Sequence, residues 1–268
     1  MAKLHILREV EVEPQKTYPV DCRVEGLAWS KLLSPREYAI WLVTAELQPG
    51  GTMSWNSGHR EESLYVLSGA LEVDGRTIPE GGAIVLEDGV PLRARAVSAT
   101  KIAHFGTWAA DPARHVLYGP PRESDHVAHL VGPKGWYVSG FPGVEAKWFA
   151  DSTCETCRVT FFEIDSKPGG SPGQHLHSQD ELIYILKGKI FLGKRECGPG
   201  TVLCIPGDVR YSFNGGPEPY GFLNYRPDAS TTVHFERGPD PITEIETGLA
   251  VNGRAVNDVE HLPAMAVL

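Results

Sequence analysis

Residues 168–188 read PGGSPGQHLHSQDELIYILKG, and residues 49–69 read PGGTMSWNSGHREESLYVLSG. Sliding the sequence by 119 positions matches residues 49–92 to 168–211 without a gap. Ten of the aligned pairs are identical, and conservative apolar pairs fill the spaces between them. Chance rarely arranges such a match, so the sequence predicts two copies of one domain.

Within each copy, runs of apolar β-forming residues lie between glycines. In the second copy, residues 181–187, 189–193 and 200–206 follow a pattern of strand, turn and strand. The 29 glycines and 21 prolines are spread along the chain, which suits short strands joined by tight turns. We therefore expect an all-β protein built from two tandem jelly-roll β-barrels, because such closure protects the edge strands.

The expected domains are residues 1–125 and residues 126–268. Residues 112–135 have the composition of turns and a linker, and they are expected to carry the chain between the two copies. The pattern of the tail from 241 to 268 is less regular. We expect it to form a strand or a short helix that packs on the other copy.

The overall composition favours small-molecule chemistry. A net charge of -9 argues against a nucleic-acid or anionic-membrane surface, because both require basic patches. No window reaches the run of about 20 apolar residues that a membrane span requires. The N-terminus lacks the continuous apolar core of a signal peptide, so we expect a cytoplasmic protein whose five cysteines are reduced.

Three potential metal ligands lie within seven residues of the second copy. If residues 174–178 are extended, His175 and His177 point to the same face, because side chains alternate along a strand. The short link that follows lets the next strand begin at Glu181, whose carboxylate can complete the set. Two histidines and one carboxylate can hold a divalent ion and leave positions open for substrate, water or dioxygen.

With these ligands, the sequence resembles the cupin superfamily. The first cupin motif is a glycine, five residues, His-x-His, three residues, a glutamate, six residues and a glycine. It is matched by Gly169, His175, His177, Glu181 and Gly188, and the second motif runs from Gly200 to Pro206. The resemblance covers both halves, and it implies a bicupin with its metal site in the C-terminal copy.

The second motif departs from the family pattern at the place of a third histidine ligand. This chain has Tyr211 there, and Asp208 replaces the usual glycine. On an extended strand, Tyr211 would face the barrel interior near the metal. Four roles are open for Tyr211: a ligand, a hydrogen-bond partner of a metal-bound water, an acid or base, and a plain core residue. His234 is the candidate for a distant replacement ligand.

The first copy lacks most of this set. Asn56, Gly58 and Leu92 stand where His175, His177 and Tyr211 stand in the second copy, and only Glu62 is retained. One carboxylate cannot hold a metal alone, and His59 is displaced by one residue, which turns it to the opposite face of a strand. We interpret the first copy as a structural or interface domain, with Glu62 hydrogen-bonded to local polar groups.

Further residues are candidates for a substrate pocket around the metal. The expected apolar walls are Phe161, Ile183, Ile185 and Phe213, each of which would equally serve as barrel core. Arg210 and Arg226 flank the second motif and are candidates for pairing with the carboxylate of an anionic substrate.

A separate pair of cysteines, Cys154 and Cys157, has the spacing of half a zinc site or of a redox pair. No second pair of cysteines or histidines lies close to it in the sequence. The favoured interpretation is therefore two reduced thiols at the start of a strand.

Three functions compete for this pattern. The leading hypothesis is a mononuclear metal enzyme that acts on a small organic molecule. The first expectation for the enzyme class is a dioxygenase, and the preferred metal is iron, with manganese, nickel or zinc as alternatives. The first alternative is a non-redox lyase, isomerase, decarboxylase or hydrolase that uses Tyr211 as acid or base. The second is a non-catalytic binding protein. No nucleic-acid or membrane partner is expected, and duplicated barrels favour a homodimer.

Overall fold

The computed structural model describes residues 3–108, 127–141, 143–151, 154, 156–227, 232–235, 243–246 and 253–263. Within these ranges, every regular element except the 3-10 turn Glu9–Glu11 is a β-strand. The all-β prediction is confirmed. The described residues contain no helix that is long and apolar enough to span a membrane.

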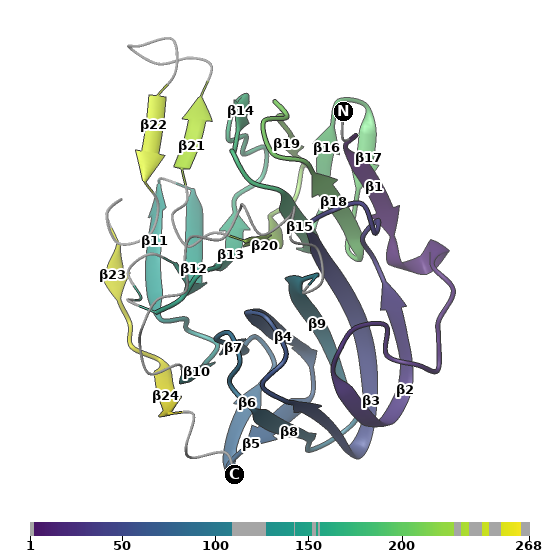
Figure 1. Cartoon of the computed structure of the whole chain (residues 1–268). Coiled ribbons are helices and arrows are strands. Elements are labelled where there is room, and N and C mark those ends of the chain that lie inside the picture. The colour runs from purple at the N-terminus through teal and green to yellow at the C-terminus, as the bar shows by residue number, and fades with distance from the viewer. Residues whose placement is uncertain are drawn as a thin grey trace.

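Two large antiparallel sheets make up most of the protein (Figure 1). The strands of the ten-stranded sheet are β2 (Arg23–Leu32), β3 (Ile40–Trp55), β4 (Glu62–Ser68), β5 (Ala70–Val73), β6 (Arg76–Pro79), β7 (Ala83–Leu86), β8 (Leu92–Ala96), β9 (Thr100–Thr107), β10 (Val127–Val131) and β24 (Val259–Pro263). The strands of the eight-stranded sheet are β1 (His5–Arg8), β11 (Tyr137–Phe141), β12 (Val144–Ala150), β13 (Thr160–Ser166), β15 (Glu181–Lys187), β18 (Thr201–Ile205), β20 (Tyr220–Arg226) and β23 (Arg254–Ala255).

Two small three-stranded sheets complete the second half. One contains β14 (His175–Leu176), β21 (Thr232–Phe235) and β22 (Thr243–Glu246), and the other contains β16 (Ile190–Leu192), β17 (Arg195–Cys197) and β19 (Asn214–Gly215). The first of these carries one of the candidate ligands, His175.

The two copies share one strand register. Glu62 lies opposite Leu86, and Glu181 lies opposite Ile205, so both partners keep the offset of 119 residues that the sequence shows. The register also shifts at equivalent places, between residues 66 and 68 in β4 and between residues 185 and 187 in β15. The repeat in the sequence is therefore a repeat of structure, including its bulges.

One pair of equivalent glycines in the repeat occupies a position that only glycine can fill. Gly69 and Gly188 each end a strand with a positive φ, 81° and 63°. A Cβ atom on Gly188 would collide with the backbone of Pro219, and one on Gly69 would collide with the backbone of Ala99. Only glycine combines this backbone conformation with such a close approach.

The halves exchange strands with each other. The N-terminal strand β1 pairs with β18 of the eight-stranded sheet, while β10 and β24 extend the ten-stranded sheet beside β7. Part of the tail therefore packs as a strand on the first copy. The expected boundary between residues 125 and 126, and most of the expected linker, lie outside the described residues.

A large core fills the space between the two sheets. Its buried aromatic residues include Phe105, Phe149, Phe161 and Tyr225, whose rings contact one another. Strands from both halves contribute to it, so the two sheets are held together by apolar burial. Each half has a further apolar interior of its own.

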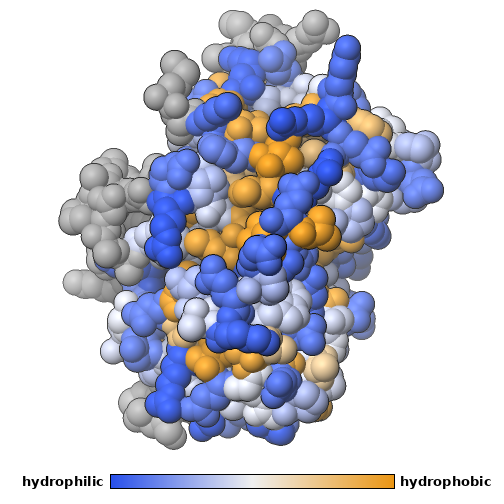
Figure 2. All heavy atoms as spheres, turned by 90° about the vertical axis from the view of Figure 1, so that its right-hand side faces the viewer, coloured by the Kyte–Doolittle hydropathy of each residue, from blue (hydrophilic) through white to orange (hydrophobic). Residues whose placement is uncertain are grey.

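The surface offers few isolated apolar side chains. On the face that Figure 2 shows, hydrophobic side chains are visible as a band between hydrophilic ones. Among the described residues, the large apolar side chains that are strongly exposed are Val10 (86%) and Val97 (47%). The homodimer expected from the sequence stays a prediction.

Candidate functional site

Strand β14 and the start of β15 bring the candidate ligands to the mouth of the second barrel. His175 is tied to Tyr211 by two backbone hydrogen bonds, of 3.0 and 2.9 Å, and the backbone oxygen of His177 accepts a bond from Asp208 at 2.7 Å. Glu181 is the first residue of β15. All four side chains of His175, His177, Glu181 and Tyr211 are buried.

The two imidazoles are oriented toward this site by local contacts. Nδ1 of His175 lies 2.9 Å from the carbonyl oxygen of Gly173, which leaves Nε2 as the nitrogen available to a ligand. The rings of His175 and His177 have centroids 5.2 Å apart, and Nε2 of His177 is 3.7 Å from Oε1 of Glu181. Burial lowers the pKa of His175, which favours the neutral form that a metal ligand requires.

The carboxylate of Glu181 is the centre of a buried polar network. Its Oε2 accepts a hydrogen bond from the hydroxyl of Tyr211 at 2.5 Å, and its Oε1 accepts one from Nδ2 of Asn224 at 2.5 Å. Arg226 donates to the same Oε1 from Nε at 3.1 Å and from Nη2 at 2.6 Å. Burial alone would raise the pKa of Glu181, but the charge of Arg226, followed by that of His177, holds it well below its usual range. Glu181 is therefore an anion.

Tyr211 keeps its proton in this arrangement. Burial raises its pKa well above the usual value, and the negative charge of Glu181 raises it further. The phenol is thus a hydrogen-bond donor to Glu181 rather than a ready base. A proton could leave Tyr211 only if an additional positive charge came close to its oxygen.

These polar groups open into a pocket of about 560 Å³. Its polar lining includes His175, His177, Glu181, Tyr211, Asn224 and Arg226, together with Ser139 and Ser171. Its apolar lining includes Trp148, Phe162, Ile164, Ile183, Phe213 and Phe222. Such a cavity, apolar with a few convergent polar groups, is typical of a site for a small organic ligand.

Only some of the residues predicted from the sequence to form the pocket walls line the pocket in the structure. Ile183 and Phe213 line the pocket, and Ile185 is buried in the apolar cluster around it. Phe161 instead points into the core between the two sheets, because its neighbour Phe162 occupies the pocket face of β13. The placement of Phe161 at the pocket was wrong.

Of the two arginines, Arg226 reaches the site and Arg210 does not. Arg210 is exposed, whereas Arg226 is 4% exposed and lies in the pocket. His234 pairs with Leu176 in the β14–β21 ladder, while Phe235 pairs with His175. Because neighbours on a strand face opposite ways, His234 lies on the face away from His175.

The equivalent position in the first copy is filled rather than hollow. Glu62 accepts hydrogen bonds from Nε1 of Trp55 at 2.6 Å and from Nε2 of His104 at 2.7 Å. The rings of Trp55 and Trp41 both pack edge-on against His104. His59 is buried with its two ring nitrogens near the carbonyl oxygens of Arg60 and Val90. Among the residues that the structure describes, no group of three potential metal ligands surrounds Glu62.

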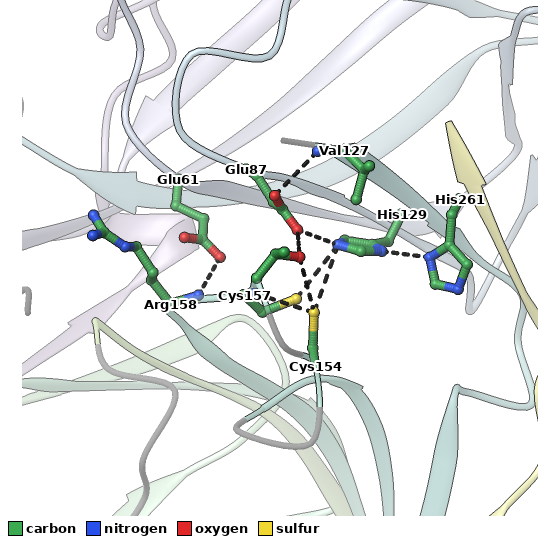
Figure 3. Close-up of polar contacts among 9 residues, drawn as sticks. Glu61, Glu87, Val127, His129, Cys154, Cys157, Arg158 and His261 are labelled. Carbon is green, nitrogen blue, oxygen red and sulfur yellow. Dashed lines mark hydrogen bonds and ion pairs between the residues drawn. The ribbon is translucent and has the colours of Figure 1, made fainter. Parts of the chain in front are cut away.

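A second group of potential ligands, which the sequence did not reveal, lies between the two sheets. Ligand atoms of Glu87, His129, Cys154 and Cys157 all lie within 4.8 Å of one another, and all four residues are buried. Figure 3 shows their side chains pointing toward a common centre. A buried cluster of this composition could hold a metal ion. The Cys-x-x-Cys spacing was its only local signal.

Contacts within this cluster shift the pKa values of Cys154 and His129. A hydrogen bond from Cys157 is the main cause that lowers the pKa of the Cys154 thiol to about 3. Burial alone would lower the pKa of His129, but hydrogen bonds with Cys154 and Glu87 raise it to about 9. The Cys154 thiol is therefore more acidic than an ordinary cysteine and lies beside an imidazole that is more basic than usual. None of the five cysteines forms a disulfide.

The residues of the second barrel fit a divalent transition ion by donor type. Two imidazoles and a carboxylate suit such ions, and the Nδ1 contact of His175 is the usual way in which a ligand histidine is oriented. The three ligand atoms do not share the mutual 4.8 Å spacing found at Glu87, so they would have to close around an ion. Glu181 would then share an oxygen between the ion and its present donors.

Comparison with known proteins shows which solved structures have a similar fold. No protein-family model matches the chain, and no curated protein matches it. Among solved structures, it is similar to a mutant of Bacillus subtilis oxalate decarboxylase, with 14% identity, a TM-score of 0.62 and coverage of 85% of this chain and 78% of that one. At this identity the likeness concerns the fold alone.

Two other structures agree with this result. Lactobacillus farciminis oxalate decarboxylase in a formate complex matches with 14% identity and a TM-score of 0.62, covering 87% of this chain and 88% of that one. A Bacillus subtilis oxalate decarboxylase studied for its Mn(II) centres matches with 14% identity and a TM-score of 0.60, covering 84% and 77%. The shared architecture extends over both halves of the chain.

Proposed function

Since this chain has the bicupin fold of the cupin superfamily, we propose that its second barrel is the active site of a metal-dependent enzyme that acts on a small organic acid with an apolar body. His175, His177 and Glu181 would hold one divalent transition metal, with iron preferred and manganese, nickel or zinc as alternatives. The observation that carries the proposal is the pocket of about 560 Å³ in which these residues meet Arg226.

An acidic substrate is favoured by an unsatisfied hydrogen-bond donor in that pocket. Nη1 of Arg226 is buried without a hydrogen-bond partner among the described residues. A buried donor without a partner is costly, and a carboxylate is the group that a guanidinium binds best. The ring of Phe162 lies 5.6 Å from the guanidinium carbon and holds it in place.

The apolar walls define the rest of the substrate. The aromatic rings of Trp148 and Phe162, with centroids 4.4 Å apart, form one side, and Phe213 and Phe222 form another. These walls exclude water from the reacting group and favour an aliphatic or aromatic body. They suit a larger and more apolar acid than the oxalate of the fold relatives.

The metal would supply a binding position for substrate or dioxygen and a positive charge. The protein supplies orientation: Arg226 fixes Glu181, and Tyr211 holds its proton between its own oxygen and Oε2 of Glu181. Oxygen-dependent chemistry is the first reaction to test, because a set of two histidines and one carboxylate leaves adjacent positions open.

A non-redox reaction is the second candidate, and the contact between Tyr211 and Glu181 favours it. A phenol hydrogen-bonded to a metal-ligand carboxylate is placed to give a proton to a substrate in the pocket. In that case the metal would act as a Lewis acid, as in lyases, isomerases, decarboxylases and hydrolases.

One experiment tests the proposal and separates the reactions. Protein purified without chelators is analysed for metals, loaded with Fe(II) or Zn(II), and assayed on a panel of small carboxylic acids with and without oxygen. Oxygen consumption by the iron form alone supports the dioxygenase, and anaerobic turnover by the zinc form supports the non-redox enzyme. Metal binding without turnover of any acid would leave a binding protein and contradict the enzyme.

A further inference from the structure

The two sheets are linked at one buried point by side chains from three segments. Glu87 follows β7, and His129 lies on β10, both in the ten-stranded sheet. Cys154 and Cys157 lie between β12 and β13 of the eight-stranded sheet. The four residues are between 0% and 4% exposed. Any group that binds all four therefore ties one half of the chain to the other.

The distances among these side chains match a tetrahedral metal site. Nε2 of His129 is 3.5 Å from Sγ of Cys157, 3.9 Å from Sγ of Cys154 and 2.8 Å from Oε1 of Glu87. With zinc bonds of their usual lengths, tetrahedral edges would be about 3.6 Å between sulfur and nitrogen and about 3.4 Å between nitrogen and oxygen. Of these three pairs, only His129 and Glu87 would have to move apart.

Neighbouring groups hold each ligand in the orientation that a metal requires. Oε2 of Glu87 accepts a hydrogen bond from the amide of Val127 at 3.1 Å, which aims Oε1 at the centre. Nδ1 of His129 is 2.7 Å from Nδ1 of His261, which leaves Nε2 facing the sulfurs. The amide of Cys157 donates to Sγ of Cys154 at 3.1 Å. Such outer contacts are typical of metal ligands.

The composition of the cluster also favours a cation. The carboxylate of Glu87 and the sulfurs of Cys154 and Cys157 are buried here beside His129. In Figure 3 the guanidinium of Arg158 points away from the sulfurs. Buried anions are costly unless a cation or a metal compensates them. A divalent ion at the centre would do so.

We propose that Glu87, His129, Cys154 and Cys157 bind one zinc ion that clamps the two halves of the protein together. Two sulfurs, one nitrogen and one oxygen form a set that zinc binds with tetrahedral geometry. All four positions are supplied by the protein, so the site is closed to substrate and its role is structural. It is separate from the His175 site.

The competing use of these residues is a reversible disulfide between Cys154 and Cys157. A redox pair needs only the two sulfurs, whereas here a carboxylate and an imidazole are also buried and aimed at them. That difference favours the metal. The disulfide is an outcome that the test must be able to show.

The test measures metal and its ligands directly. Full-length protein is purified without chelators, its zinc is quantified, and X-ray absorption at the zinc edge counts the sulfur ligands. We expect one zinc per chain with two sulfur and two nitrogen or oxygen neighbours. Replacement by cobalt should give thiolate-to-cobalt charge-transfer absorption and the intense visible bands of a tetrahedral site. A Cys154–Cys157 disulfide in freshly purified protein, with no sulfur-bound metal, would overturn the proposal.

Variants separate this site from the candidate active site. The double variant Cys154→Ser/Cys157→Ser should lose the sulfur-bound zinc, and Cys22→Ser is its control, because Cys22 is a buried thiol outside the cluster. The variant His175→Ala/His177→Ala should keep the sulfur-bound zinc, whatever happens to turnover. If the double cysteine variant does not fold, removing zinc from the wild type with a chelator must still lower its melting temperature. Sulfur-bound zinc that survives in the cysteine variant, or a chelator without effect on melting, refutes the clamp.

Discussion

Tyr65 and Tyr184, which are 119 residues apart, each donate their hydroxyl to a buried carboxylate from elsewhere in the chain. Tyr65 binds Oε2 of Glu163 at 2.8 Å, and Tyr184 binds Oε2 of Glu9 at 2.9 Å. In both cases a lysine completes the contact, with Lys147 and Lys101 each 2.8 Å from the carboxylate. The duplication has thus kept the same contact twice. Tyr65 on β4 joins Glu163 on β13 of the other sheet, and Tyr184 on β15 is linked through Glu9, in the 3-10 turn, to Lys101 on β9 of the other sheet.

We expect Tyr65→Phe and Tyr184→Phe each to lower the free energy of unfolding by about 1.5 to 3 kcal/mol, the usual worth of a hydrogen bond to a charged group. Urea unfolding followed by circular dichroism measures the change. Tyr220→Phe is the matched control, because the hydroxyl of Tyr220 donates to a neutral carbonyl oxygen at 3.2 Å. Equal, small effects in all three variants would contradict the inter-sheet role.

The adjacent residues Phe161 and Phe162 give a second comparison. Phe161 is fully buried between the sheets, and Phe162 lines the pocket. Phe161→Ala should cost about 3–5 kcal/mol, because it leaves a sealed cavity in a packed core. Phe162→Ala only enlarges an existing pocket and should cost clearly less. The midpoints of urea unfolding measure the loss of stability in each variant. An equal loss in Phe161→Ala and Phe162→Ala would show that the pocket wall is as tightly packed as the core.

The same pair shows where prediction from sequence ends. Both faces of β13 are buried, so alternation of polar and apolar residues gave no sign of which phenylalanine faces the pocket. The strand content and the duplication could be predicted, because glycines and apolar runs repeat at one offset. Glu181 could be placed at the start of a strand for the same reason.

The partners of Glu181 were harder to predict. Asn224 and Arg226 lie on β20, which comes after the ungapped match ends at residue 211. Their place beside β15 follows from sheet pairing that no local pattern encodes. The zinc cluster was hidden for the same physical reason, because its ligands Glu87, His129 and Cys154 are far apart in the sequence and meet only through the packing of two sheets.

The repeat also provides a matched pair of glutamates for the metal question. Glu181→Gln should abolish binding of Mn(II) to the second barrel, because an amide is a weak ligand, whereas Glu62→Gln should leave it unchanged. Titration of Mn(II) followed by its EPR signal is a suitable measurement, since this hard ion avoids the thiolates between the sheets. If Glu181→Gln bound Mn(II) with the affinity of the wild type, the carboxylate of Glu181 would not be a metal ligand.

Arg226 offers the sharpest test of the substrate class. Arg226→Lys keeps a positive charge beside the buried Glu181, so the fold should survive, but it removes the planar fork that pairs with a carboxylate. We expect the Kd of a carboxylic acid with an apolar body, such as phenylacetate, to rise about tenfold, or about 1.4 kcal/mol. Isothermal titration calorimetry measures the Kd, and the neutral analogue phenylacetamide should bind both proteins equally. Arg210→Lys is the control, because Arg210 is exposed and is not among the residues that line the pocket. Equal weakening of both ligands, or none for the acid, would show that Arg226 serves Glu181 alone and that the substrate is not recognised by its carboxylate.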